Sequence, residues 1–147
     1  MTILFSNATD YYACKGFNLD QVAREARDKT DGFAAANTLV AVGLSGALVV
    51  PHLAVTFGKH ACIIRKSNEM TLSHNHYVGD VGEEKAALVG TIGTRWVFVD
   101  DFVGMGTTRQ RALDIVSKVA PDSTYMGSFL YGCGLQSTAI WFPEAEA

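Results

Sequence analysis

Two adjacent carboxylates, Asp100 and Asp101, are the residues of this chain whose types and position best suit chemistry. They end an apolar run, which predicts a buried strand over 95–100 that delivers both acids to its carboxyl end. Ligands of open parallel sheets bind at that end of the strands. Neighbouring strand residues point to opposite faces, so the two acids can accept from two sugar hydroxyls or order Mg²⁺ through water. In an ordinary surface loop, such a pair is only a solvated turn former.

A glycine-spaced turn, Gly104-Met105-Gly106-Thr107-Thr108, follows the acids. Glycine allows positive φ and exposes backbone N–H groups, and a helix start adds partial positive charge. The combination predicts a pocket that holds sugar hydroxyls at the acids and a phosphate at the turn. The turn lacks the Gly-Lys-Ser/Thr ending of a Walker loop and the spacing of a dinucleotide fingerprint. The alternative is a plain strand-to-helix turn with Thr107 as the helix cap.

A second glycine turn, Gly43-Leu44-Ser45-Gly46, follows the apolar run 38–42. If it lies beside the first turn in a parallel sheet, it is a candidate second anion loop that offers backbone N–H groups. Arg65 and Lys66 end the next strand at the same edge, and their charge has the sign that a polyphosphate requires. A charged strand end is otherwise simply solvated.

His74 and His76 lie in a long polar and acidic segment, 67–87. His-x-His can bind a metal, but the sequence near it has no cysteine or second histidine pair, which disfavours a zinc site. We expect histidines that close over a ligand, or exposed surface histidines. A loop of this length within a compact domain is typical of a functional or disordered segment.

The surrounding pattern predicts a single α/β domain over residues 1–147, with a mostly parallel twisted sheet flanked by helices. Asn18 caps the first helix, which ends near Gly32, and Pro51 lies near the beginning of the second helix, which Gly58 closes. Strand, helix and strand over 38–65 make a βαβ unit. We expect strands over 38–42, 61–65, 87–92, 95–100, 125–130 and 139–142, and helices over 18–32, 47–57 and 107–119.

Composition excludes several classes of protein. The formal charge of −3 argues against a basic nucleic-acid-binding face. Three widely spaced cysteines indicate neither a disulfide framework nor a zinc site, and fit a reducing cytoplasm. The start of the chain lacks a basic, then apolar, leader, and no apolar stretch reaches the ~20 residues that cross a bilayer. We therefore expect a cytoplasmic protein without a membrane partner.

The segment 97–108 resembles the acid-turn motif of the type I phosphoribosyltransferase family, in which an apolar strand runs into two acids and a Gly/Thr-rich turn. The resemblance covers roughly residues 18–131. The segment 40–46 matches the family's pyrophosphate loop, Ile63-Ile64-Arg65-Lys66 matches the next element, and 67–94 matches its mobile catalytic loop. Phe102 and the Arg-Lys pattern look most like bacterial xanthine and orotate members.

This resemblance implies transfer of ribose 5-phosphate from 5-phosphoribosyl-1-pyrophosphate (PRPP) to a purine or orotate-like base, with release of pyrophosphate. Mg²⁺ would arrive with PRPP, without direct protein ligands except Asp100 or Asp101 through water. The implied catalytic residues are Asp100, Asp101, His74 and His76. The implied PRPP-binding residues are Gly43, Leu44, Ser45, Gly46, Arg65, Lys66, Asp100, Asp101, Phe102, Val103, Gly104, Met105, Gly106, Thr107 and Thr108.

Within that resemblance, the acids would hold the ribose hydroxyls, and the amides of 104–108 with the Thr107 and Thr108 hydroxyls would hold the 5-phosphate. Met105 and Thr107 depart from the family pattern. Only 1–17 and 132–147 are available for the base-reading hood, which is thus reduced. The family is usually dimeric, so a homodimer is expected. The alternative to an enzyme is an inactive PRPP- or nucleotide-binding regulatory or accessory module.

Overall fold

The computed structural model describes residues 19–29, 31–66, 87–100, 105–131 and 140–143. They form a small α/β domain with one mixed, mostly parallel sheet flanked by helices, as the sequence predicts at this level. The strands are β1 (Thr38–Val42), β2 (His60–Ile64), β3 (Leu88–Gly90), β4 (Arg95–Asp100), β5 (Thr124–Leu130) and β6 (Ile140–Pro143). The helices are α2 (Leu19–Lys29), α3 (Asp31–Ala35), α4 (Gly43–Phe57) and α7 (Met105–Val119).

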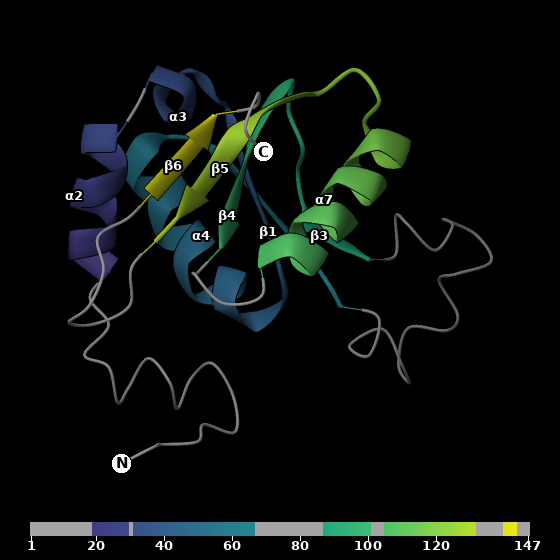
Figure 1. Ribbon diagram of the computed structural model, residues 1–147, viewed down its shortest axis with the longest axis horizontal. Coiled ribbons are helices and arrows are strands. Elements are labelled where there is room, and N and C mark those ends of the chain that lie inside the picture. The colour runs from purple at the N-terminus through teal and green to yellow at the C-terminus, as the bar shows by residue number, and fades with distance from the viewer. Residues whose placement is uncertain (1–18, 30, 67–86, 101–104, 132–139, 144–147) are drawn as a thin grey trace, which may run out of the picture.

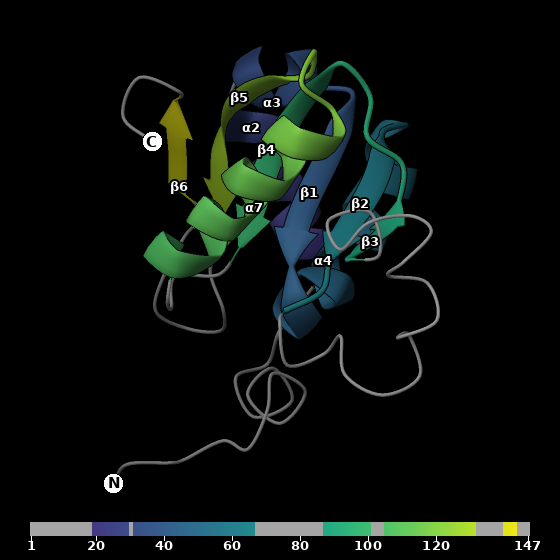
Figure 2. The ribbon, with the colours of Figure 1, turned by 90° about the vertical axis from the view of Figure 1, so that its right-hand side faces the viewer.

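The strand order is β3-β2-β1-β4-β5-β6 (Figure 2). The four inner strands are parallel, and β3 and β6 pair antiparallel at the two margins. From β1 the chain runs outward through β2 and β3, then crosses to the other side of β1 for β4, β5 and β6. The direction of progression therefore reverses between β1 and β4. In open α/β sheets, this switch point at the carboxyl ends of the strands is the usual ligand site.

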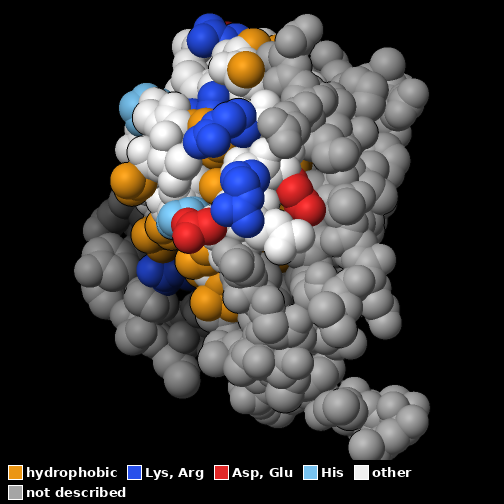
Figure 3. All heavy atoms as spheres, turned by 90° about the vertical axis from the view of Figure 1, so that its left-hand side faces the viewer, with side chains coloured by type: hydrophobic (Ala, Val, Ile, Leu, Met, Phe, Trp, Pro, Cys, Tyr) orange, Lys and Arg blue, Asp and Glu red, His pale blue; other side chains and the backbone are white. Residues whose placement is uncertain are grey.

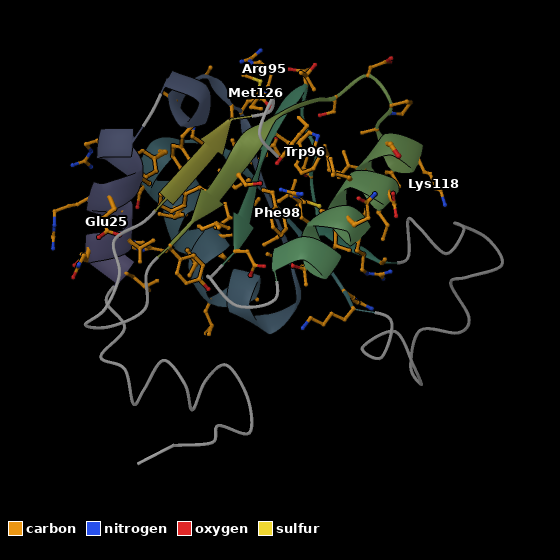
Figure 4. All side chains as sticks on the ribbon, in the orientation of Figure 1. Glu25, Arg95, Trp96, Phe98, Lys118 and Met126 are labelled. Atoms are coloured by element: carbon orange, nitrogen blue, oxygen red, sulfur yellow. The ribbon has the colours of Figure 1, made fainter. Side chains whose placement is uncertain are left out.

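Two apolar layers cover the sheet, with α2, α3 and α4 on one face and α7 on the other (Figure 1). Side chains alternate along each strand, so β1 and β4 each supply both layers. Leu39 and Val97 pack on the side of α2, α3 and α4. Trp96 and Phe98 pack on the side of α7 (Figure 4). This two-sided burial explains why both strands read as continuous apolar runs.

Helix α2 covers the first layer with one face and presents the other to solvent. Val22, Ala23 and Ala26 are buried, while Arg24 and Arg27 are exposed. Lys and Arg side chains are scattered among acidic and neutral groups on the surface that includes this helix (Figure 3). The mixture is typical of the solvated side of an amphipathic helix.

Several predicted element ends are wrong by a few residues. Helix α4 begins at Gly43 instead of 47, so Pro51 lies about two turns inside it rather than near its beginning. Gly32 does not end a helix but lies within α3. Gly58 does close α4, in the left-handed region at φ 65°, with its N–H bonded to the carbonyl of Ala54. Helix α7 begins at Met105, two residues before the predicted start.

The strands agree more closely with prediction. β1 and β4 have their predicted bounds, and β1 and β2 are parallel around α4, as expected of a βαβ unit. β3 is shorter than the predicted 87–92, so the end of the predicted 67–94 loop is a strand paired with β2. β6 pairs with β5, and residues 140–143 thereby extend the sheet. Among the described helices, none combines the length and apolar character that crossing a bilayer requires.

Candidate functional site

The carboxyl ends of β1, β2 and β4 bring several predicted site residues to one edge of the sheet. Val42 is paired with Ile64, so Gly43 and Arg65 leave their strands side by side. The β1–β4 pairing includes Val40 with Phe98, which sets Asp100 near the end of β1. The structure thus brings Gly43, Arg65 and Asp100 to one edge of the sheet at the switch point.

Asp100 is held firmly at this edge. Its residue is only 4% exposed, and its carboxylate Oδ2 accepts a hydrogen bond from Thr108 Oγ1 at 2.8 Å. Its backbone carbonyl accepts from the Tyr131 N–H at 3.0 Å. Strand alternation explains the partner, because Asp100 shares the α7 side of the sheet with Trp96 and Phe98. The side chain therefore has one fixed orientation.

Thr108 lies differently from the prediction. Its hydroxyl was expected to donate to a phosphate, whereas in the structure it donates to the Asp100 carboxylate. A hydroxyl has one proton to donate and two lone pairs to accept with. As arranged, the Thr108 proton is directed to the Asp100 carboxylate, and the hydroxyl orients that acid.

The segment 43–46 is the first turn of α4 and not a separate loop. Gly43 has φ 78°, a conformation that side-chain-bearing residues rarely adopt, and no side chain caps the helix at Val42. The N–H groups of a first helical turn lack partners within the helix, so they provide the predicted anion-binding capacity in another form. Gly46 has a packing role, since a Cβ there would lie 2.1 Å from the Ala41 Cβ.

Lys66 extends over the start of α4. A Cβ added to Gly43 would lie 2.7 Å from the Lys66 Cε, so the lysine stem occupies the space that a larger residue at 43 would fill. The Arg65 N–H donates to the carbonyl of Ala87 at 2.9 Å, which ties the exit of β2 to the chain entering β3. A positive charge is thus close to the first turn of α4.

Arg111 belongs to this edge although the sequence analysis did not select it. Its Nε and Nη2 both donate to the Arg65 carbonyl, at 2.9 and 2.6 Å. The sequence pattern that could have identified Arg111 is its spacing from Thr108. Residues three apart on one helix lie on the same face. That face was read only as the apolar stripe that includes Ala112 and Val116.

Other predicted site residues are placed only in part. Leu44 and Ser45 lie in the first turn of α4, and Met105, Gly106 and Thr107 in the first turn of α7. Thr107 is thus inside the helix and not at the cap position before it. Six predicted residues fall outside the described ranges: His74, His76, Asp101, Phe102, Val103 and Gly104.

The chemistry available at this edge is that of charge complementarity. A fixed carboxylate can accept from hydroxyls, while the cations and the helix starts can bind an anion. Within the described ranges, no three His, Cys, Asp or Glu side chains gather as a metal site. Cys62 lies buried in the middle of β2, where desolvation raises the pKa of its thiol to about 12, so it is not a nucleophile at neutral pH.

A scan against models of known protein families finds no match to this chain, and a search of curated proteins finds none either. Membership of the type I phosphoribosyltransferase family therefore stays a prediction from the motif.

Proposed function

We propose that this protein binds PRPP together with Mg²⁺ and transfers its ribose 5-phosphate to a nitrogenous base, releasing pyrophosphate. The observation that carries the proposal is the switch point between β1 and β4. There, a buried acid at the end of one strand stands beside a glycine-initiated helix and a lysine at the ends of its neighbours. A phosphorylated sugar with an anionic leaving group presents the complementary chemistry, with hydroxyls at one end and a diphosphate at the other.

In this proposal, Asp100 accepts a hydrogen bond from a ribose hydroxyl. A carboxylate offers about four acceptor sites, so that bond is compatible with the one from Thr108. Because Thr108 orients the carboxylate and the Tyr131 N–H holds the Asp100 backbone, little reorganisation is needed when positive charge develops on the sugar. The acid thereby lowers the energy of an oxocarbenium-like transition state.

The diphosphate occupies the other end of the proposed site. The first turn of α4 supplies N–H groups, and Lys66 and Arg65 supply positive charge beside them. Mg²⁺ would make the diphosphate a better leaving group, and Asp100 is an oxygen donor of the kind that Mg²⁺ prefers, directly or through water. Catalysis on this model is mainly positioning and electrostatics.

The base, the assembly and the compartment are further parts of the proposal. A purine or orotate-like base is the expected acceptor, the protein would act as a homodimer, and a cytoplasmic setting fits the three cysteines. The residues from which a base-reading hood would be built, 1–17 and 132–147, are described only at 140–143, which lie in the sheet.

A second candidate is a module that binds PRPP or a nucleotide without transferring the sugar. The Asp100–Thr108 hydrogen bond favours it, because two groups expected to contact opposite ends of the ligand are bonded to each other instead. Such a module would serve as a regulatory or accessory subunit.

One experiment separates the two candidates. The full chain is incubated with PRPP, Mg²⁺ and a panel of purines, pyrimidines and orotate, pyrophosphate is measured, and PRPP binding is followed by calorimetry. Binding with base-dependent pyrophosphate release supports the enzyme. Binding without release for any base supports the module, and absence of PRPP binding contradicts both the transferase and a PRPP-binding module.

A further inference from the structure

The two hydrogen bonds from Arg111 to one carbonyl oxygen have a consequence for the anion end of the site. Arg65, which supplies that oxygen, is the residue just beyond β2. Its N–H is held by the Ala87 carbonyl and its C=O by the guanidinium, so both of its backbone polar groups are fixed. The next residue is Lys66, whose stem lies over Gly43. The direction in which Lys66 leaves the sheet is therefore set by Arg111.

Helix α7 joins the two ends of the proposed site. Thr108 and Arg111 are three residues apart and share one face of the helix. Thr108 contacts the end of β4, and Arg111 contacts the exit of β2, with β1 lying between these strands. α7 lies across this face of the sheet (Figure 2). One rigid element therefore fixes the distance between the acid and the lysine.

We infer that Arg111 is a positioning residue for the diphosphate end of the site, holding the β2 exit so that Lys66 stays over the first turn of α4. The inference rests on the proposed function, because the ligand is the pyrophosphate portion of PRPP. Arginine suits the role, since its planar fork donates two bonds in a fixed direction, whereas lysine is a flexible point charge. The ribose end depends on Asp100 and Thr108 and should not require Arg111.

The test uses two half-ligands on the full chain. Inorganic pyrophosphate with Mg²⁺, and separately ribose 5-phosphate, are titrated calorimetrically into wild type, Arg111→Gln, Arg111→Lys and Arg109→Gln. Arg109 is the matched control, because it lies on the same helix two residues away and therefore does not face the same way. Circular dichroism and thermal melting establish that each variant is folded.

For Arg111→Gln we expect pyrophosphate affinity to fall about 10-fold, as loss of a charge-assisted bond predicts, with ribose 5-phosphate affinity unchanged within about twofold. Arg109→Gln should change both affinities by no more than about twofold. Arg111→Lys keeps the charge but not the fork, so it should lose pyrophosphate affinity as well. If Arg111→Gln does not fold, Arg111→Lys carries the same test.

Three results would overturn the inference. These are full pyrophosphate affinity in Arg111→Lys, equal losses for both half-ligands in Arg111→Gln, and no loss for either. Wild-type protein that binds neither half-ligand would overturn the proposed function itself, and this inference with it. If the wild-type protein binds both half-ligands and the Arg111 variants bind them equally well, only the inference about Arg111 is contradicted.

Discussion

The two ends of the parallel strands use similar residue types in different ways. At the amino ends of β1 and β4, Asn37 accepts from the Thr38 hydroxyl at 2.9 Å and the Arg95 N–H at 3.1 Å, and donates to Thr94 Oγ1 at 2.9 Å. The Thr38 hydroxyl in turn accepts from the Gly93 N–H at 2.8 Å. Loops and strand starts are thereby tied to one another.

The cationic side chains of the amino edge also bond within the scaffold, to backbone carbonyls. Lys59 Nζ donates to the carbonyls of Ala34 and Ala36, and Arg95 Nε donates to that of Ala35 at 2.7 Å. These three carbonyls lie at the end of α3, where cations stabilise the helix. Burial, with the nearby Arg95 charge, lowers the pKa of Lys59.

At the carboxyl edge, the same kinds of hydrogen bond orient the charged groups of the candidate site. Thr108 orients Asp100, and Arg111 orients the exit of β2 that carries Lys66. The contrast teaches that polarity alone does not mark a functional edge. The amino edge bonds its polar groups within the scaffold, whereas the carboxyl edge sets an acid and cations beside a helix start at the switch point. We expect substitutions at the first edge to affect stability and those at the second to affect binding.

The largest expected effect is on stability, from Asn37→Ala. Three hydrogen bonds are lost at about 1 kcal/mol each, so the free energy of unfolding should fall by about 3 kcal/mol in urea denaturation. Gln21→Ala is the control, because the bond from its amide to Glu25 is long, at 3.5 Å, and exposed, and should matter little. PRPP affinity should stay at the wild-type level; a matching loss of affinity would erase the distinction between the edges.

The next effect is on binding, from Asp100→Asn. Removing the charge should weaken PRPP about 30-fold, or about 2 kcal/mol, while the melting temperature changes little because an amide oxygen still accepts from Thr108. Calorimetry measures the affinity. Asp114→Asn, on the exposed side of α7, is the charge-matched control. A variant that loses folding and keeps its affinity would show that Asp100 belongs to the scaffold alone.

Thr108→Val tests the bond that separates the transferase from the binding module. It leaves the buried Asp100 carboxylate without its hydroxyl donor, so the free energy of unfolding should fall by about 1.5 kcal/mol. Thr108→Ser restores the hydroxyl and should restore stability. Tighter PRPP binding by the valine variant would mean that the native bond competes with the ligand, contrary to the orienting role given to Thr108.

The last effect is confined to alkaline pH and comes from a group at neither edge. Cys62 has a pKa of about 12 in the native state against 9.0 for a free thiol, so above pH 9 the unfolded chain binds fewer protons than the native one. Its contribution to the unfolding free energy is full below pH 9 and declines above it by at most about 1.4 kcal/mol per pH unit. Cys62→Ala should show a shallower alkaline decline in urea denaturation, the remaining titrating groups being common to both proteins. Parallel pH curves would contradict this.

The accuracy of the predicted strand and helix bounds depends on how few adjacent residues are needed to specify each bound. β1 and β4 were predicted with their observed bounds, because each is a short apolar run closed by a glycine or an acid. The start of α4 was missed because Gly43 and Gly46 look like loop residues. In the structure, Gly43 adopts positive φ where the helix begins, and Gly46 lets α4 lie against Ala41. The position of Pro51 in the helix was therefore also wrong, because the predicted start at 47 placed it near the beginning.

The site shows the same division more sharply. The amino-acid sequence alone determined that an acid, a glycine and a basic pair would each follow a strand, because alternation and chain breaks are properties of a few adjacent residues. Only the tertiary structure decided that Thr108 donates to Asp100 and that Arg111 donates to the Arg65 carbonyl at the exit of β2. Those partners depend on strand order and on where α7 starts and crosses the sheet. The Arg111 contact joins residues 46 positions apart, and the Thr108 contact spans eight residues across a strand-to-helix connection, so the periodicity within a single element specifies neither.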